Sequence, residues 1–88
     1  MKTIFKNSFY KGIKRIDSSA IKKEIAAVIC EVESASCPRS IPDLKKITGY
    51  DRCFRIKVKD YRIGIKILGD TVYFVACEHR KDIYRIFP

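Results

Sequence analysis

Basic side chains recur at short spacing in the second half of the chain. Arg55 and Lys57 are two residues apart, Arg62 follows five residues later, and His79 and Arg80 come near the end. RNA can be cleaved without a metal when a base activates the 2′-hydroxyl, cations stabilise the phosphate oxygens and an acid assists the leaving 5′-oxygen. Because basic side chains can fill all three roles, this set predicts a metal-free phosphodiester site.

Two of these residues are candidates for moving the proton. Crowded cations favour one another's neutral forms, which suits Lys57 to act as a base, whereas an arginine stays charged and clamps phosphate. His79 is the only histidine of the chain, and a lone histidine is more often structural than catalytic. The residues by themselves leave both candidates open.

An aromatic side chain follows the last basic residues. Tyr84 comes directly after the run His-Arg-Lys-Asp-Ile, and an exposed tyrosine beside cations can stack on a nucleobase. In the alternative reading, Tyr84 and Ile83 simply pack on the edge of a sheet. The residues expected to contact the RNA backbone are Lys45, Lys46, Arg55, Lys59 and Lys81.

The composition is that of a small, basic, folded protein. With 88 residues, 47% of them hydrophobic, the chain has room for one domain, which we expect to span residues 1–88. Its formal net charge of +9 must be carried on the surface and predicts an anionic partner. Charge alone does not choose between nucleic acid, an acidic protein and an anionic membrane, nor does it exclude a merely soluble basic protein.

The four cysteines, Cys30, Cys37, Cys53 and Cys77, form no CxxC pair. We interpret them as reduced thiols, three of them buried, and expect neither a metal site nor a cofactor. The first residues include no apolar stretch long enough for a signal peptide, and no run approaches the length of a membrane span. The expected location is therefore the cytoplasm, without a membrane partner.

Two amphipathic helices are expected in the first half of the chain, after a short strand at residues 2–5. The apolar residues with helical spacing are Phe9, Ile13 and Ile16 in the first helix, and Ile21, Ile25, Val28, Ile29 and Val32 in the second. Residues 17–19 offer an N-cap for the second helix, and Cys37-Pro38 should end that region. The helices should form an antiparallel hairpin.

The second half alternates apolar and polar residues with period two, which is typical of antiparallel strands. Leu44 lies in a short segment, and longer runs cover residues 54–58, 61–67 and 72–76. The sequence therefore predicts an α+β fold: a two-helix antiparallel hairpin packed on one face of a small, mainly antiparallel, four-stranded sheet. The other face should carry the site.

Two turns set the expected register. Leu68 should face Thr71 across a tight turn whose first central residue is a glycine. Uninterrupted pairing from that turn places Arg62 opposite Cys77, Gly64 opposite Val75, and His79 on the same face as Arg62.

The other turn lies at Lys59-Asp60 and should place Lys57 opposite Arg62, and Arg55 opposite Gly64, whose missing side chain leaves a gap. Like charges directly opposed in a sheet are unfavourable. A bound polyanion explains this pair, and the alternative is that both side chains extend into water.

The segments LKKITG, CFRIKVKDYRIGIKI and GDTVYFVACEHRKDIYRIFP resemble the RelE/ParE superfamily of type II toxins over nearly the whole chain. The resemblance implies the RelE-like microbial RNase fold and cleavage of mRNA in the ribosomal A site, leaving a 2′,3′-cyclic phosphate. The family's two sheet cations match Arg55 and Lys57, and its strand arginine matches Arg62. Its late arginine and tyrosine match Arg80 and Tyr84.

The resemblance also implies partners and exposes one departure. The expected partners are a cognate antitoxin, in a toxin–antitoxin hetero-oligomer, and the ribosome with its mRNA. The position of Arg55 is a lysine in the best-known RelE pattern, and arginine is a poor base. The base would then have to be Lys57 or His79.

Three functional interpretations follow. In the first, the chain is a ribosome-dependent endoribonuclease that inhibits translation: Lys57 or His79 is the base, Arg62 holds the phosphate, Arg80 neutralises or protonates the leaving group, and Tyr84 positions the nucleobase. In the second, it is a ParE-like toxin that inhibits DNA gyrase by binding, without nuclease activity. In the third, it is an inert relative or a structural RNA-binding domain.

Overall fold

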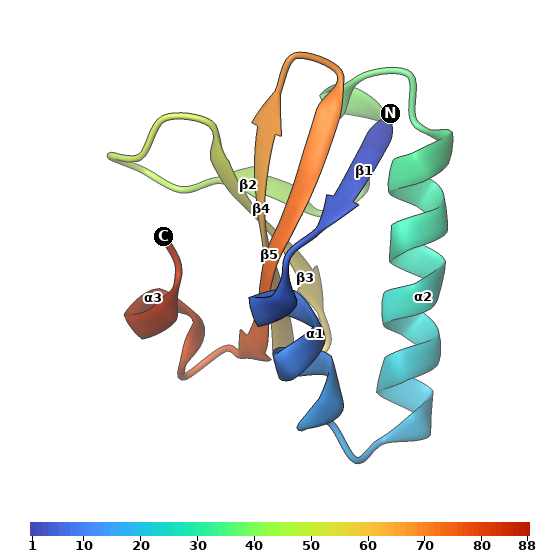
Figure 1. Cartoon of the computed structure of the whole chain (residues 1–88), viewed down its shortest axis with the longest axis vertical. Helices are drawn as coiled ribbons and strands as arrows, with labels where there is room; N and C mark the ends of the chain where they lie inside the picture. The colour runs from blue at the N-terminus through green and yellow to red at the C-terminus, as the bar shows by residue number, and fades with distance from the viewer.

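The computed structural model describes residues 1–88 and contains one five-stranded sheet in the order β1-β5-β4-β3-β2 (Figure 1). The strands are β1 (Lys2–Phe5), β2 (Leu44–Lys46), β3 (Cys53–Val58), β4 (Tyr61–Leu68) and β5 (Thr71–His79). The helices are α1 (Asn7–Lys14), α2 (Ser19–Ser34), the short 3₁₀ helix η1 (Pro38–Ser40) and α3 (Ile83–Ile86). The α+β prediction is confirmed, but the sheet has one strand more than the predicted four.

The two outer strands fall on segments that the sequence marks: β1 is the strand predicted at residues 2–5, and β2 is the short segment at Leu44. β2 pairs antiparallel with β3, from Leu44 opposite Ile56 to Lys46 opposite Phe54. β1 pairs parallel with β5, from Lys2 opposite Thr71 onwards. Both are short edge strands whose few residues carry only a weak period-two signal.

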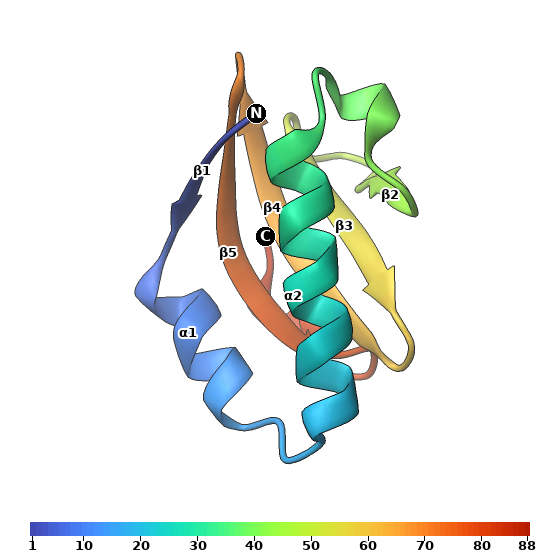
Figure 2. The same cartoon turned by 90° about the vertical axis from the view of Figure 1, so that its right-hand side faces the viewer.

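α2 is the helix that the sequence predicts. Ser18 is its N-cap, and the Ser18 side chain accepts a hydrogen bond of 3.2 Å from the Ile21 backbone N–H. The helix crosses one face of the sheet (Figure 2), where it buries Ile25 and Val32. It ends before Cys37, whose extended backbone conformation suits a residue that precedes proline.

α1 runs antiparallel to α2 and lies beside the part of β5 that β1 leaves free (Figure 1). The Ser8 hydroxyl donates to the Val75 carbonyl oxygen. A Cβ on Gly12 would lie 2.1 Å from the carbonyl oxygen of Cys77, so only glycine permits this approach. The helix thereby covers the edge of β5 and sends Phe9 into the core.

The main core lies between the two long helices and the sheet. Phe74 is fully buried at its centre, with ring centroids 4.9 Å from Phe5 and 5.3 Å from Phe9. Ile63 and Ile65 of β4 are also fully buried. Each such side chain contributes about 1.5–3 kcal/mol when it leaves water.

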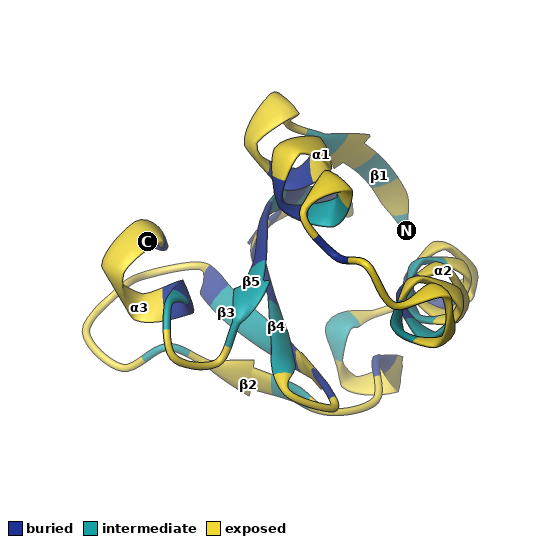
Figure 3. Cartoon of the chain, turned by 90° about the horizontal axis from the view of Figure 1, so that it is seen from below, coloured by how far each residue is buried: buried dark blue, intermediate teal, exposed yellow.

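A second, smaller core lies on the opposite face, which we call the α3 face. α3 and α2 lie on opposite sides of the sheet (Figure 3). The members of this cluster are Cys53, Ala76, Ile83 and Phe87. A Cβ on Gly64 would lie 2.5 Å from the Phe87 ring, so Phe87 fills the gap expected beside Gly64. The prediction that this whole face is free for a site is therefore wrong.

The register agrees with the prediction at both turns and departs from it between them. Leu68 faces Thr71, and Lys57 faces Arg62, as predicted. A β-bulge between Gly64 and Ile65 interrupts the pairing of β4 with β5, so that one residue of β5, Val75, has no partner.

The bulge changes which side chains share a face. Arg62 pairs with Glu78 instead of Cys77, and Gly64 pairs with Ala76 instead of Val75. Cys77 joins the main core, whereas Ala76 lies in the smaller cluster on the α3 face. Both predicted pairings are therefore wrong, because they assumed an uninterrupted ladder.

The cysteines are reduced, but two rather than the predicted three are buried. Cys53 and Cys77 are buried, and Cys30 and Cys37 are exposed. Burial, with a smaller effect of the Glu78 charge, raises the pKa of Cys77 to about 12, so that Cys77 stays a neutral thiol. None of the helices is both long and apolar enough to cross a membrane.

Candidate functional site

Cations from neighbouring strands form two adjacent rows on the α3 face. In one row Lys45 of β2 faces Arg55 of β3. In the next row Lys57 of β3 faces Arg62 of β4, as the sequence predicts. A sheet separates directly paired residues by about 5 Å, so each row opposes like charges at close range. An anion bound between the two rows could contact cations of both.

Arg62 has a structural role that the sequence analysis missed. Its Nη1 donates hydrogen bonds of 2.8 Å and 2.9 Å to the carbonyl oxygens of Lys59 and Tyr61. These bonds hold the turn between β3 and β4, where Lys59 has a φ of 55°. The guanidinium is thus oriented by the protein, and its Nε and Nη2 remain available to an anion.

Arg80 lies beside the same turn. Its backbone N–H donates a bond of 2.7 Å to the carbonyl oxygen of Asp60, and its Nε lies 3.8 Å from the Asp60 carboxylate. Both side chains are more than half exposed, so this ion pair contributes little to stability. The Arg80 side chain can exchange Asp60 for another anion at small cost.

A pocket of about 200 Å³ lies at the first row, between β2, β3 and α3. It is lined by Lys45, Lys46, Ile47, Thr48, Arg55 and Tyr84. Tyr84 is 60% exposed, which rules out the reading that it packs into the sheet edge, whereas Ile83 is fully buried. A pocket that combines cations with an accessible aromatic ring suits a nucleotide, which has both a phosphate and a base.

His79 does not join these cations. It pairs with Tyr61 on the helix side of the sheet, where the two rings meet edge to face with centroids 5.6 Å apart. Its Nδ1 accepts a bond of 3.1 Å from the Lys81 backbone N–H. Its predicted position beside Arg62 is wrong, because the bulge reverses the side-chain direction in the last part of β5.

The remaining predicted contacts are dispersed. The Lys59 ammonium lies 3.9 Å from the Glu24 carboxylate of α2, in a groove away from the two rows. Lys81 is exposed in the turn before α3. The structure therefore brings together Lys45, Lys46, Arg55 and Tyr84 at one pocket and Lys57 with Arg62 beside it, and it leaves His79, Lys59 and Lys81 outside.

Glu78 is a further residue that the sequence analysis missed. It is the one carboxylate in the row of Lys57 and Arg62, and its side chain is 12% exposed. Arg15 at the end of α1 binds it, with Nη1 3.1 Å and 3.3 Å from the two carboxylate oxygens. Because Arg15 pairs with Glu78, the row of Lys57 and Arg62 keeps its positive charge. Gly64 was the signal that the sequence offered, because a glycine inside a strand often marks a β-bulge. The bulge is what places Glu78 opposite Arg62.

The chain is similar to known proteins over its whole length. The model of a family described as the ParE toxin of the type II toxin-antitoxin system parDE matches residues 3–84. A protein named Toxin RelE3, from Methanocaldococcus jannaschii, is 40% identical over 89 residues, and the match covers all of both chains.

Solved structures show the same fold. A RelB-RelE antitoxin-toxin complex from Methanococcus jannaschii contains a chain with a TM-score of 0.82 and 39% identity, covering 97% of this chain and 99% of that one. The RelBE complex of E. coli, at 16% identity, gives a TM-score of 0.70 with 89% and 94% coverage. From the family match and the identity to Toxin RelE3, we conclude that the chain belongs to the RelE/ParE superfamily of type II toxins.

Proposed function

We propose that this toxin is an endoribonuclease that cleaves mRNA in the ribosomal A site and thereby inhibits translation. The direct pairing of Lys57 with Arg62, beside the pocket of Arg55 and Tyr84, is the observation that carries the proposal. Two opposed cations beside a cationic pocket with an exposed aromatic ring suit an RNA backbone and a base at the same time.

In the proposed mechanism the 2′-hydroxyl of the RNA is the nucleophile. In this scheme Lys57 Nζ accepts the proton of that hydroxyl, the 2′-oxygen forms a bond to phosphorus, and the bond from phosphorus to the 5′-oxygen breaks. The products are a 2′,3′-cyclic phosphate and a 5′-hydroxyl. Arg55 stays charged and cannot be the base, and His79 lies on the other side of the sheet, so Lys57 is the preferred candidate.

The arginines stabilise charge in this scheme. The free Nε and Nη2 of Arg62 donate to the non-bridging phosphate oxygens, on which negative charge develops in the transition state. Arg80, which is only weakly paired with Asp60, neutralises the leaving 5′-oxygen until that oxygen takes a proton from water. Neither role requires either arginine to lose its own charge.

The pocket of Lys45, Lys46 and Tyr84 positions the RNA. Stacking of a base on an aromatic side chain contributes about 1–3 kcal/mol, and the lysines hold the adjacent phosphates. On the ribosome, these contacts would orient a single nucleotide of the mRNA so that its 2′-hydroxyl reaches Lys57.

The proposed partners include an antitoxin. The structural relatives from Methanococcus jannaschii and E. coli were solved as complexes of a toxin with an antitoxin. We propose that this chain likewise forms a hetero-oligomer with an antitoxin in the cytoplasm, where it also meets ribosomes. The net charge of +9 favours both an acidic antitoxin segment and RNA.

The second candidate function is inhibition of DNA gyrase by binding. The matching family model, described as that of the ParE toxin, is the observation that favours it. This function requires no base and no positioned phosphate clamp, so the two candidates differ in what a substitution at Lys57 changes.

The test is primer extension on a reporter mRNA in a cell-free translation reaction, with and without ribosomes. We expect discrete cuts that need ribosomes and that disappear with Lys57→Ala. Lys66→Ala is the matched control, because Lys66 is also exposed on the α3 face but pairs with Cys53 and Tyr73, away from the cation rows. Intact mRNA with the native toxin, together with inhibited DNA supercoiling by gyrase, would establish the second candidate instead.

A further inference from the structure

One carboxylate lies at the end of the row of Lys57 and Arg62. Glu78 of β5 faces Arg62 of β4 directly, and its side chain is largely buried. An acidic residue opposite a basic one on neighbouring antiparallel strands favours a cross-strand ion pair. Such a pair would occupy the guanidinium to which the proposed mechanism assigns the phosphate of RNA.

The structure does not form this cross-strand pair. Arg62 takes part in no ion pair, and its Nη1 donates to two carbonyl oxygens at the turn between β3 and β4. The Glu78 carboxylate instead accepts from Arg15, whose Nη1 lies 3.1 Å and 3.3 Å from its two oxygens. Two arginines therefore lie near one carboxylate, and the one outside the cation rows binds it.

Packing of α1 on β5 holds Arg15 at this place (Figure 1). Gly12 lets the helix approach the backbone of Cys77, the residue before Glu78. Arg15 caps α1, and its backbone N–H donates a bond of 3.2 Å to the Gly12 carbonyl oxygen. The next residue, Ile16, is buried in the main core. The backbone is therefore anchored on both sides of Arg15, although the side chain itself is exposed.

Loss of Arg15 would leave Glu78 without its partner. An unpaired carboxylate in a poorly solvated position is unfavourable, so it turns to another cation. Arg62 lies directly opposite, and its Nε and Nη2 are free to donate. Their capture by Glu78 would withdraw them from a phosphate, and the carboxylate would also repel that phosphate.

We propose that Arg15 is a positioning residue of the RNA-binding site. By binding Glu78 it keeps this carboxylate from Arg62 and leaves the Arg62 guanidinium free for a phosphate of single-stranded RNA. The inference rests on the proposed function in one respect, namely that the bound anion is RNA. If the ion pair only fastened α1 to β5, its loss would lower stability and would affect RNA binding no more than the loss of any other surface cation.

The test is fluorescence anisotropy of the full-length chain with a labelled, 2′-O-methylated single-stranded RNA, which cannot form a cyclic phosphate, over a range of salt concentrations. Arg15→Gln should weaken binding by about tenfold. The lost phosphate contact of Arg62 should also reduce the slope of log affinity against log salt by about 0.7. Lys14→Gln is the matched control, because Lys14 is exposed in the same turn, forms no ion pair and carries the same charge. It should weaken binding far less and leave the slope unchanged.

Removal of the carboxylate should reverse the defect. Glu78→Gln should change RNA binding little by itself, because Arg15 already pairs with Glu78, but in the Arg15→Gln background it should restore the native affinity. Arg15→Lys, which keeps the charge, should bind nearly as well as the native chain, and circular dichroism checks that every variant is folded.

Three outcomes would overturn the proposal: equal affinities of Arg15→Gln and Lys14→Gln, no recovery in the double variant, or no binding of RNA by the native chain. The assay contains no ribosomes and no cleavable RNA, so its outcome does not depend on whether the chain is a nuclease. Failure of the proposed function is measured separately, as intact mRNA in the primer-extension reaction.

Discussion

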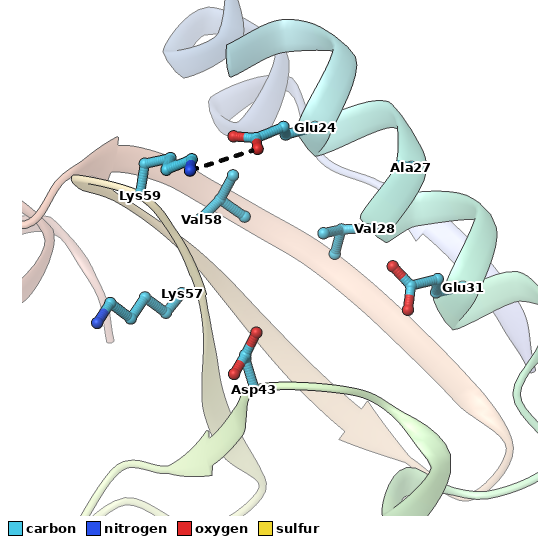
Figure 4. A pocket seen from close by; sticks show the side chains of 8 residues that line it. All are labelled: Glu24, Ala27, Val28, Glu31, Asp43, Lys57, Val58 and Lys59. Carbon is cyan, nitrogen blue, oxygen red and sulfur yellow. Dashed lines mark ion pairs between the residues drawn. The ribbon is translucent and has the colours of Figure 1, made fainter. Parts of the chain in front are cut away.

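The nucleotide-sized pocket at Arg55 and Tyr84 and a second pocket, of about 370 Å³ between α2 and β3 (Figure 4), share strand β3, yet they differ in chemistry. Arg55 and Lys57 point to the α3 face, whereas Ile56 and Val58 are buried on the helix side. Successive side chains of a strand point to opposite faces. β3 therefore presents cations on one face and an apolar surface, flanked by carboxylates, on the other.

The largest effect on mRNA cleavage should come from removing the Lys57 side chain of β3. Lys57→Ala should lower the rate of mRNA cleavage by about 10²-fold or more, because it removes the proposed general base. Lys57 is exposed, so urea unfolding should give nearly the native stability. Cleavage at the native rate, measured by primer extension, would remove Lys57 from the mechanism.

Substitution of Ile56, the residue before Lys57, should instead lower stability and leave cleavage intact. Ile56→Ala should lower the free energy of unfolding by about 2–5 kcal/mol, because Ile56 is 1% exposed and the variant leaves a cavity in the main core. The protein that remains folded should still cleave mRNA. Urea unfolding monitored by circular dichroism measures the first effect, and a loss below about 1 kcal/mol would contradict the structural role of Ile56. Loss of cleavage in the folded variant would show that the two faces are not separate.

Tyr84 tests whether the cationic pocket holds a base. In a Lys57→Ala background, which prevents cleavage, Tyr84→Ala should weaken binding of a short single-stranded RNA by about 1–3 kcal/mol. Tyr84→Phe retains the ring and should bind nearly as well as the parent. Fluorescence anisotropy with labelled RNA gives both values, and equal affinity of the alanine and phenylalanine variants would exclude stacking.

The smallest of these effects concerns Arg62, which belongs to the site and also holds a turn. Arg62→Ala removes the bonds to the carbonyl oxygens of Lys59 and Tyr61 and should lower stability by about 1–2 kcal/mol. Arg55→Ala loses no such bonds and should change stability by less than about 0.5 kcal/mol. Chemical unfolding of the two variants separates the structural role of Arg62 from its proposed role in binding phosphate, and equal losses would deny Arg62 the structural role.

Much of the candidate site followed from local patterns. The period-two runs and the turn at residues 59–60 correctly predicted that Lys57 faces Arg62 and that Arg55 faces Gly64. A two-residue hairpin leaves little freedom in register. The position of His79 did not follow, because one bulged residue in β5 reverses every later side chain.

The sequence by itself determined α1, α2, the long strands and the pairing of β3 with β4, since each depends on hydrophobic spacing and turn chemistry within a few residues. The tertiary structure decided which cationic side chains lie close to one another. Packing of Phe87 on Gly64 folds α3 back over the sheet, and this brings Tyr84 to Lys45, Lys46 and Arg55. It also decided the pocket between α2 and β3, which Val28 and Val58 line from the two elements. Such contacts between distant segments depend on the packing of the whole core, which no local pattern specifies.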